Sequence, residues 1–192
     1  IFMNNKAKKL TFISLFSGAG GFKIGLENAG FECLLASDIL EEANDTNSKN
    51  TNTKFLLKDI RKITSEEVLK ITNGKFPDVI VGGPPCQGFS VMGDKQASDP
   101  RNNLFAAYIN LVRALKPKCF ILENVKGLKT MYNGQAYRTI VDGFSESGYD
   151  IYSTILNAND YGVPQNRERV FIVGTRLNKG FSFPKSSHKK IG

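Results

Sequence analysis

The sequence predicts an α/β fold: a doubly wound, mostly parallel sheet with an antiparallel hairpin at one edge. Two observations lead to this prediction. Short apolar segments alternate with longer amphipathic segments along most of the chain, and such alternation requires crossover connections between parallel strands. The last two apolar segments are separated only by a loop rich in Asn, Asp, Gly and Pro, which favours an antiparallel pair at the edge of a mixed sheet.

Each expected element follows from its local pattern. The strands are short apolar runs rich in β-branched and aromatic residues, whereas the helices are longer and amphipathic. We expect strands over residues 10–16, 32–37, 54–57, 77–81, 119–122, 149–156 and 169–174. We expect helices over residues 21–29, 41–48, 65–71, 103–115 and 135–147. The polar segment 44–53 is expected to run from a helix end into a loop.

One domain is expected, over residues 10–177. A chain of 192 residues with 41% hydrophobic content can bury one substantial core. No apolar run approaches the roughly 20 residues that span a bilayer, so we expect no membrane partner. Segment 178–192 loses periodicity and gains Lys, Ser and Pro. We interpret it as a basic linker that leaves the domain.

Charge and the rarer residue types narrow the classes of function. The net charge of +8 is compatible with a polyanionic partner, although many basic proteins bind none. Three widely spaced cysteines form neither a disulfide framework nor a zinc pattern, which favours a reducing, intracellular setting. The single histidine, His188, lies in the basic tail. A Cys–His or Ser–His–Asp hydrolase and a histidine-rich metal site are therefore excluded.

A glycine-rich turn follows the first expected strand and opens the first helix. Ligands of an open parallel sheet bind beyond the carboxyl ends of its strands, and glycines at 18, 20 and 21 let the backbone turn tightly and approach a ligand. A plain tight turn explains the same residues. Lys23 stands where a dinucleotide-binding motif has its third glycine, so pyrophosphate binding is disfavoured.

Two acidic residues follow the next two strands. Asp38 lies about 20 residues after the glycine turn, where a carboxylate can accept hydrogen bonds from both ribose hydroxyls. The alternative is a capping box, because Glu41 follows three residues later. Asp59 and Ile60 pose the same choice between an adenine edge and a loop cap. A nucleoside pocket without a phosphate cradle indicates S-adenosylmethionine.

The segment Gly-Gly-Pro-Pro-Cys after the fourth strand presents Cys86 on a stiff turn. Burial in the core is the default for a cysteine and fits Cys33 and Cys119, which lie in apolar strands. A Pro-Pro turn is a poor place to pack a small apolar side chain, and nearby cations would favour the thiolate of Cys86. Glu123 ends an apolar strand and is expected either at the same edge of the sheet as Cys86 or as a helix cap. The Arg/Glu alternation over 165–169 indicates either part of a site or a solvated row of charges at the start of a strand.

Four segments, 16–21, 84–87, 123–125 and 165–169, occur in the order and rough spacing of the DNA cytosine-5 methyltransferase motifs. The chain resembles this family from residue 10 to about residue 174. The resemblance implies a Rossmann-like, S-adenosylmethionine-dependent methyltransferase domain. Its expected reaction moves a methyl group to C5 of a cytosine flipped out of double-stranded DNA, leaves S-adenosylhomocysteine and needs no metal.

The resemblance also implies roles for individual residues. Cys86 would add to C6 of the base, Glu123 would bind the N3/N4 edge in its protonated form, and Arg169 would steady O2, with Arg167 beside it among the catalytic residues. The cofactor residues would be Phe16, Gly18, Gly20, Gly21, Asp38, Ile39, Asp59, Ile60, Pro85 and Leu104. The DNA-contacting residues would be Gln87, Ser90, Lys95 and Arg101, on a loop that closes over the flipped base.

Complete members of this family continue into a target-recognition region and a terminal motif that returns to the catalytic domain. Nothing after residue 174 resembles either part. We therefore expect a truncated chain or one subunit of a split enzyme whose partner supplies recognition, with little sequence-specific methylation by this chain alone. The implied setting is restriction-modification or orphan methylation, in the nucleoid-associated cytoplasm if the source is bacterial.

Two other functions are compatible with the motifs. The first is methylation of tRNA at cytosine C5. The Gly-Phe-Ser continuation over 88–90 favours DNA methyltransferases over tRNA methyltransferases. The second is a cofactor-binding or interaction subunit without catalysis. The presence of Cys86, Glu123 and Arg169 together argues against that second alternative.

Overall fold

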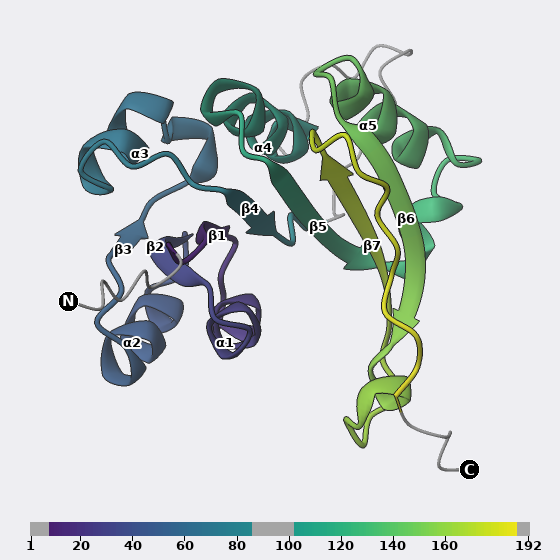
Figure 1. The fold of residues 1–192 in the computed structure, drawn as a ribbon, viewed down its shortest axis with the longest axis horizontal. Helices are drawn as coiled ribbons and strands as arrows, with labels where there is room; N and C mark the ends of the chain where they lie inside the picture. The colour runs from purple at the N-terminus through teal and green to yellow at the C-terminus, as the bar shows by residue number, and fades with distance from the viewer. Residues whose placement is uncertain (1–7, 86–101, 188–192) are drawn as a thin grey trace, which may run out of the picture.

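The computed structural model describes residues 8–85 and 102–187, which form one sheet of seven strands in the order β3-β2-β1-β4-β5-β7-β6 (Figure 1). The strands are β1 (Thr11–Leu15), β2 (Glu32–Asp38), β3 (Phe55–Leu57), β4 (Val79–Gly82), β5 (Cys119–Val125), β6 (Asp150–Asn157) and β7 (Glu168–Thr175). The α-helices are α1 (Gly21–Asn28), α2 (Glu41–Asn50), α3 (Ser65–Ile71), α4 (Asn102–Leu115) and α5 (Gln135–Ser145). Short 3-10 helices are η1 (Ile60–Lys62), η2 (Lys126–Lys129) and η3 (Ala158–Tyr161).

The first five strands are parallel and wind in two directions. From β1 the chain moves outward through β2 to β3, and it then returns to place β4 against the other side of β1. Helices α1 and α2 cover one face of the sheet, and α3, α4 and α5 cover the other (Figure 1). The reversal creates a crevice at the carboxyl ends of β1 and β4, where ligands of doubly wound sheets bind. The predicted fold class is confirmed.

The predicted antiparallel hairpin lies at the edge of the sheet, with its strands in an order that the sequence pattern did not specify. The last strand, β7, inserts between β5 and β6 and runs antiparallel to both. Its register pairs Val125 with Arg169 and Glu123 with Phe171. Because β7 runs backwards, its first residues lie beside the last residues of β5.

The core is thickest between the sheet and helices α3 to α5. Phe120 of β5 stacks on Phe144 of α5 with ring centroids 3.9 Å apart, and Tyr149 meets Phe120 edge-on at 5.2 Å. Phe120 and Phe144 are fully buried. Gly174 of β7 faces this stack, since a Cβ atom there would lie 2.0 Å from Cε1 of Phe120. The ring therefore occupies the space that any larger residue would need.

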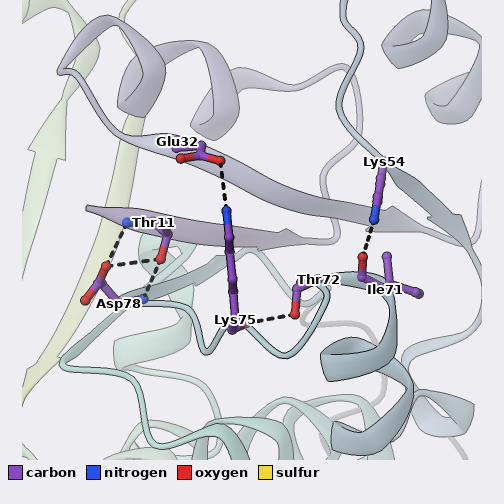
Figure 2. A network of polar contacts seen from close by, with 7 residues as sticks. All are labelled: Thr11, Glu32, Lys54, Ile71, Thr72, Lys75 and Asp78. Atoms are coloured by element: carbon purple, nitrogen blue, oxygen red, sulfur yellow. Dashed lines mark hydrogen bonds and ion pairs between the residues drawn. The ribbon is translucent and has the colours of Figure 1, made fainter. Parts of the chain in front are cut away.

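Polar contacts tie the opposite, amino-terminal edge of the sheet together (Figure 2). Thr11 donates from its backbone N and its Oγ1 to Oδ2 of Asp78, at 2.9 and 3.1 Å, and accepts from the backbone N of Asp78 at 3.2 Å. Lys118 Nζ lies 2.8 Å from Oδ1 of Asp78. Burial raises the pKa of Asp78, but the hydrogen bonds from Lys118 and Thr11 outweigh it and hold the pKa below its ordinary value. This edge is structural and lies away from the crevice.

Part of the expected basic tail lies along the hairpin. The ring of Phe181 contacts Tyr152 of β6 at a centroid distance of 5.7 Å and Phe183 at 5.0 Å. Tyr161 donates a hydrogen bond to the carbonyl of Pro184 at 3.0 Å. Figure 1 shows this final segment running beside β6 and β7. Within residues 8–85 and 102–187, no helix is both long and apolar enough to cross a bilayer.

Candidate active site

The turn after β1 forms one wall of the crevice. Phe16, Gly18 and Gly20 all adopt positive φ angles, of 52°, 49° and 93°, and Gly20 N donates to the Ser17 carbonyl at 2.9 Å. Positive φ is costly for a residue with a side chain, so Phe16 is held in a strained conformation that aims its ring into the crevice. Helix α1 begins directly afterwards, at Gly21.

Asp38 connects this turn to the end of β2. Its Oδ2 accepts from the backbone N of Gly18 at 2.8 Å, and its Oδ1 accepts from the backbone N of Ile39 at 2.7 Å and of Leu40 at 3.1 Å. The N-cap of α2 is Leu40, so the capping box between Asp38 and Glu41 is not formed. The carboxylate instead holds the glycine turn against the sheet.

A cavity of about 400 Å³ lies between these segments. Seven of the ten residues predicted to bind the cofactor line it: Phe16, Asp38, Ile39, Asp59, Ile60, Pro85 and Leu104. Gly21 instead lines an adjoining cavity, and neither cavity is lined by Gly18 or Gly20. Lys58 and Arg61 also line the first cavity and were missed, because charged residues near a turn give no pattern that separates a site from a solvated surface.

Asp59 caps η1 and still lines the cavity, so the two alternatives left open by the sequence are compatible. Its Oδ1 accepts from the backbone N of Arg61 at 2.9 Å, and the Arg61 guanidinium binds both carboxylate oxygens, with Nε at 3.0 and 2.9 Å. The hydrogen bond from the Arg61 side chain lowers the pKa of Asp59 below its ordinary value. Lys58, next to it, binds Glu67 at 2.7 Å.

A second cavity, of about 610 Å³, adjoins the first. Its walls come from α1, from the face of β5, β7 and β6, and from the segment after β7 that includes Phe181. Phe16 and Gly83 line both cavities, so the two spaces meet across these residues. Ser17 also lines the second cavity, and its buried Oγ has no hydrogen-bond partner within the described part of the chain.

Glu123 lies in the wall of the second cavity between two arginines. Its Oε1 is 3.1 Å from Nε of Arg169 and 3.8 Å from Nη2 of Arg167. A Cβ atom at Gly83 would lie 3.1 Å from Oε2 of Glu123, so glycine at this position lets the loop after β4 pass close to the carboxylate. The structure therefore brings together three of the four predicted catalytic residues: Glu123 from β5, Arg169 from β7 and Arg167 from the loop directly before β7.

Two further residues hold β4 and the loop after it in place. Asn124, which is buried, donates from Nδ2 to the carbonyl of Pro84 at 2.7 Å. The hydroxyl of Tyr108 lies 3.2 Å from the carbonyls of Ile80 and Ile121 and so connects β4 to β5. Both contacts join residues far apart in the sequence, which explains why local patterns did not indicate them.

The fourth predicted catalytic residue, Cys86, lies outside the described residues. The same holds for the predicted DNA-contacting residues Gln87, Ser90, Lys95 and Arg101.

The other two cysteines are partly buried on strands and form no disulfide within the described chain. Burial raises the pKa of Cys33 to about 12 and that of Cys119 to about 11, which makes both thiols unreactive at neutral pH. Among residues 8–85 and 102–187 no group of three or more His, Cys, Asp or Glu side chains is placed to hold a metal ion.

The family model described as C-5 cytosine-specific DNA methylase matches residues 10–191. The chain belongs to this family. It is 45% identical over 179 residues to the type II methyltransferase M.FnuDI of Fusobacterium nucleatum, a match that covers 91% of this chain and 50% of that protein. It is 40% identical over 183 residues to the type II methyltransferase M1.HphI of Haemophilus parahaemolyticus, covering 93% and 49%.

Solved structures of methylases agree with the fold. A prophage-encoded protein of E. coli described as a DNA modification methyltransferase superposes with a TM-score of 0.76 at 34% identity, covering 87% of this chain and 47% of that one. Spodoptera frugiperda DNMT2 superposes with a TM-score of 0.73 at 25% identity, covering 94% and 54%. The chain thus spans about half the length of each of these four proteins.

Proposed function

We propose that this chain is the cofactor-binding and catalytic part of a DNA cytosine-5 methyltransferase. It would transfer a methyl group from S-adenosylmethionine to C5 of a cytosine that has left the duplex stack. One observation carries the proposal: a cavity bordered by acidic residues meets, across Phe16 and Gly83, a second cavity that holds Glu123 between two arginines. A methyl donor and an acceptor base could therefore meet at that junction.

The first cavity fits the adenosine part of the cofactor. Asp38 lies at its wall as the acceptor expected for ribose hydroxyls, and Asp59 lies there as the acceptor expected for the adenine amino group. Ile39 is 62% exposed on the rim, which suits a side chain that packs on a flat ring when a ligand is bound. The cofactor, once bound, supplies an electrophilic methyl group on a sulfonium.

The second cavity and the loop after β4 would act on the base. Cys86 would add as a thiolate to C6, which places carbanion character on C5 and makes it the nucleophile for the methyl group. Glu123, protonated, would donate a hydrogen bond to N3 and accept one from the N4 amino group. Arg169 would stabilise charge at O2, with Arg167 beside it. C5 would take the methyl group, with S-adenosylhomocysteine as the leaving group. The C5 proton would then pass to solvent as the C6–S bond breaks, which releases the Cys86 thiolate and restores the ring. No metal takes part.

The DNA-contacting residues are proposed on the resemblance alone. Gln87, Ser90, Lys95 and Arg101 would lie on the loop that closes over the flipped base. The naming of the similar proteins as type II methyltransferases supports a restriction-modification role. We propose in addition that the protein acts on nucleoid DNA in a bacterial cytoplasm.

A further part of the enzyme would complete the second cavity. The cavity is lined largely by apolar side chains, among them Phe22, Leu156, Phe171 and Phe181, and it lies open beside the glycine turn. The two relatives named above are about twice as long as the match. We propose that chain after residue 192, or a second subunit, covers this cavity and also carries target recognition.

A covalent trap with 5-fluorocytosine tests the proposed function. Fluorine at C5 cannot leave as a proton does, so the enzyme should remain bound to duplex DNA through Cys86 when S-adenosylmethionine is present. The protein, combined with the remainder of its enzyme where that exists, is incubated with fluorinated duplex DNA or with fluorinated tRNA and analysed by denaturing electrophoresis. The variant Cys86→Ser is the control.

We expect an adduct with duplex DNA that Cys86→Ser abolishes. An adduct with tRNA alone would replace DNA by RNA as the substrate. Binding of S-adenosylhomocysteine without any adduct would leave a cofactor-binding subunit in place of the methyltransferase. No binding of S-adenosylhomocysteine would contradict the proposal as a whole.

A further inference from the structure

Arg61 stands out in the wall of the first cavity, because its guanidinium binds the carboxylate of another residue that lines the cavity. Its Nε lies 3.0 and 2.9 Å from the two carboxylate oxygens of Asp59, and its Nη2 binds Oδ2 as well. The Asp59 side chain is only 12% exposed and Arg61 is 39% exposed. Both residues line the cavity proposed for adenosine.

Capping of η1 does not require the Arg61 side chain. The cap is the hydrogen bond from the backbone N of Arg61 to Oδ1 of Asp59, at 2.9 Å, and any residue except proline could donate it. The guanidinium adds a planar fork on the same carboxylate, a geometry that fixes the orientation of both oxygens. The fork therefore calls for an explanation that the local turn does not provide.

The charges around Asp59 are unevenly shared. Lys62, one residue after Arg61, also lowers the pKa of Asp59, but by less than Arg61 does, and burial acts in the opposite direction. Lys58 lines the cavity with its amine bound to Glu67, and Asp38 has its carboxylate bound to backbone N–H groups. Arg61 is thus the main partner that lowers the pKa of Asp59 and fixes the direction of its carboxylate.

We propose that Arg61 is a positioning residue that holds the Asp59 carboxylate in the orientation needed to accept a hydrogen bond from the 6-amino group of adenine, and so sets the preference for a 6-amino over a 6-oxo purine. This inference rests on the proposed cofactor. The backbone N, Nε and Nη2 of Arg61 are three donors to the Asp59 carboxylate. An ionised carboxylate accepts about four hydrogen bonds, so one further donor, the adenine amino group, can be accommodated. A 6-oxo group presents an acceptor to that carboxylate and is repelled.

The test measures the binding of two nucleosides by isothermal titration calorimetry. S-adenosylhomocysteine carries the 6-amino group, and S-inosylhomocysteine replaces it with oxygen. The variants are Arg61→Gln, which removes the charge, and Arg61→Lys, which keeps the charge without the fork. The matched control Lys62→Gln removes an equal charge from the next residue. Thermal unfolding of each variant separates loss of affinity from loss of stability.

We expect Arg61→Gln to weaken S-adenosylhomocysteine binding about 3- to 10-fold, the range of one charge-assisted hydrogen bond. The preference over S-inosylhomocysteine should shrink by a similar factor, Arg61→Lys should recover part of it, and Lys62→Gln should change binding less than about twofold.

Three outcomes would overturn the inference. The first is an unchanged preference in Arg61→Gln. The second is an equal loss for both nucleosides together with a lower unfolding temperature, which would make the fork purely structural. The third is an equal effect of Lys62→Gln, which would make it an effect of net charge. Failure of the unchanged protein to bind S-adenosylhomocysteine would instead refute the proposed function.

Discussion

Replacing Gly174 by alanine tests how tightly the hairpin packs on the core. The added Cβ would lie 2.0, 2.5 and 2.8 Å from three carbons of the Phe120 ring, about 1.5 Å inside the separation at which carbon atoms attract. The ring cannot easily retreat, because Phe144 stacks on it at 3.9 Å and Tyr149 meets it at 5.2 Å. Overpacking of a dense core costs about 1–3 kcal/mol, and we expect Gly174→Ala to lie at the upper end, near 3 kcal/mol.

Urea unfolding followed by circular dichroism measures this cost. At about 2–4 °C per kcal/mol for a chain of this size, the unfolding temperature should also fall by about 6–12 °C. The matched control is Gly25→Ala in α1, where a Cβ meets no atom within 4 Å, so the free energy of unfolding should be unchanged or slightly higher. In a Phe120→Ala background, Gly174→Ala should cost little, because the clashing ring is gone. A cost below about 0.5 kcal/mol in the unchanged background would refute the packing argument, since that is the size of an ordinary surface substitution.

Three other predictions follow from polar groups. The pKa of Asp78 is lowered in the folded chain. Its contribution to stability is therefore present above its ordinary pKa and is lost as the pH falls through the folded value. Asp78→Asn should unfold more easily at pH 7 and lose less stability below pH 4, as measured by acid titrations followed by circular dichroism. Asn124→Ala should cost about 1–3 kcal/mol in urea unfolding, because it leaves a buried carbonyl in the loop after β4 without its donor. The amount of covalent adduct with fluorinated DNA should fall as well. An adduct yield equal to that of the unchanged protein would contradict a positioning effect of Asn124. The thiols of Cys33 and Cys119 have pKa values of about 12 and 11. In the variant Cys86→Ser, where these are the two cysteines that remain, neither should react with iodoacetamide at pH 8 until the chain is unfolded. Rapid alkylation of the folded variant would argue against their burial.

Much of the fold was predictable because it depends on local periodicity. All seven expected strands and all five expected helices occur, with ends that move by a few residues: the strand expected over 119–122 continues to Val125, and the helix expected over 41–48 continues to Asn50. The insertion of β7 between β5 and β6 was not predictable in the same way. Strand order depends on which faces and edges remain unpaired after the crossovers have formed, and no short segment carries that information.

In the candidate site, too, some features depend on local sequence and others on long-range packing. Residues that follow parallel strands must share one edge of the sheet. The positions of Asp38, Asp59 and Glu123 in the sequence therefore suffice to group them at one site. Contacts such as that between Asn124 and the carbonyl of Pro84 join residues 40 positions apart. They depend on the side-chain packing of the folded chain, and the sequence carries no local signal for them.

The reversed direction of β7 changes which part of a loop can vary without harm. In the parallel strands, a functional side chain follows the strand, and a longer loop moves it away from the sheet. Arg169 instead lies in β7, which is paired with β5 from Val125 to Cys119. Residues added between η3 and β7 would therefore lengthen the loop without displacing the Arg169 guanidinium. The loop beside the second cavity can thus change in length while Arg169 stays paired with Val125 and in contact with Glu123.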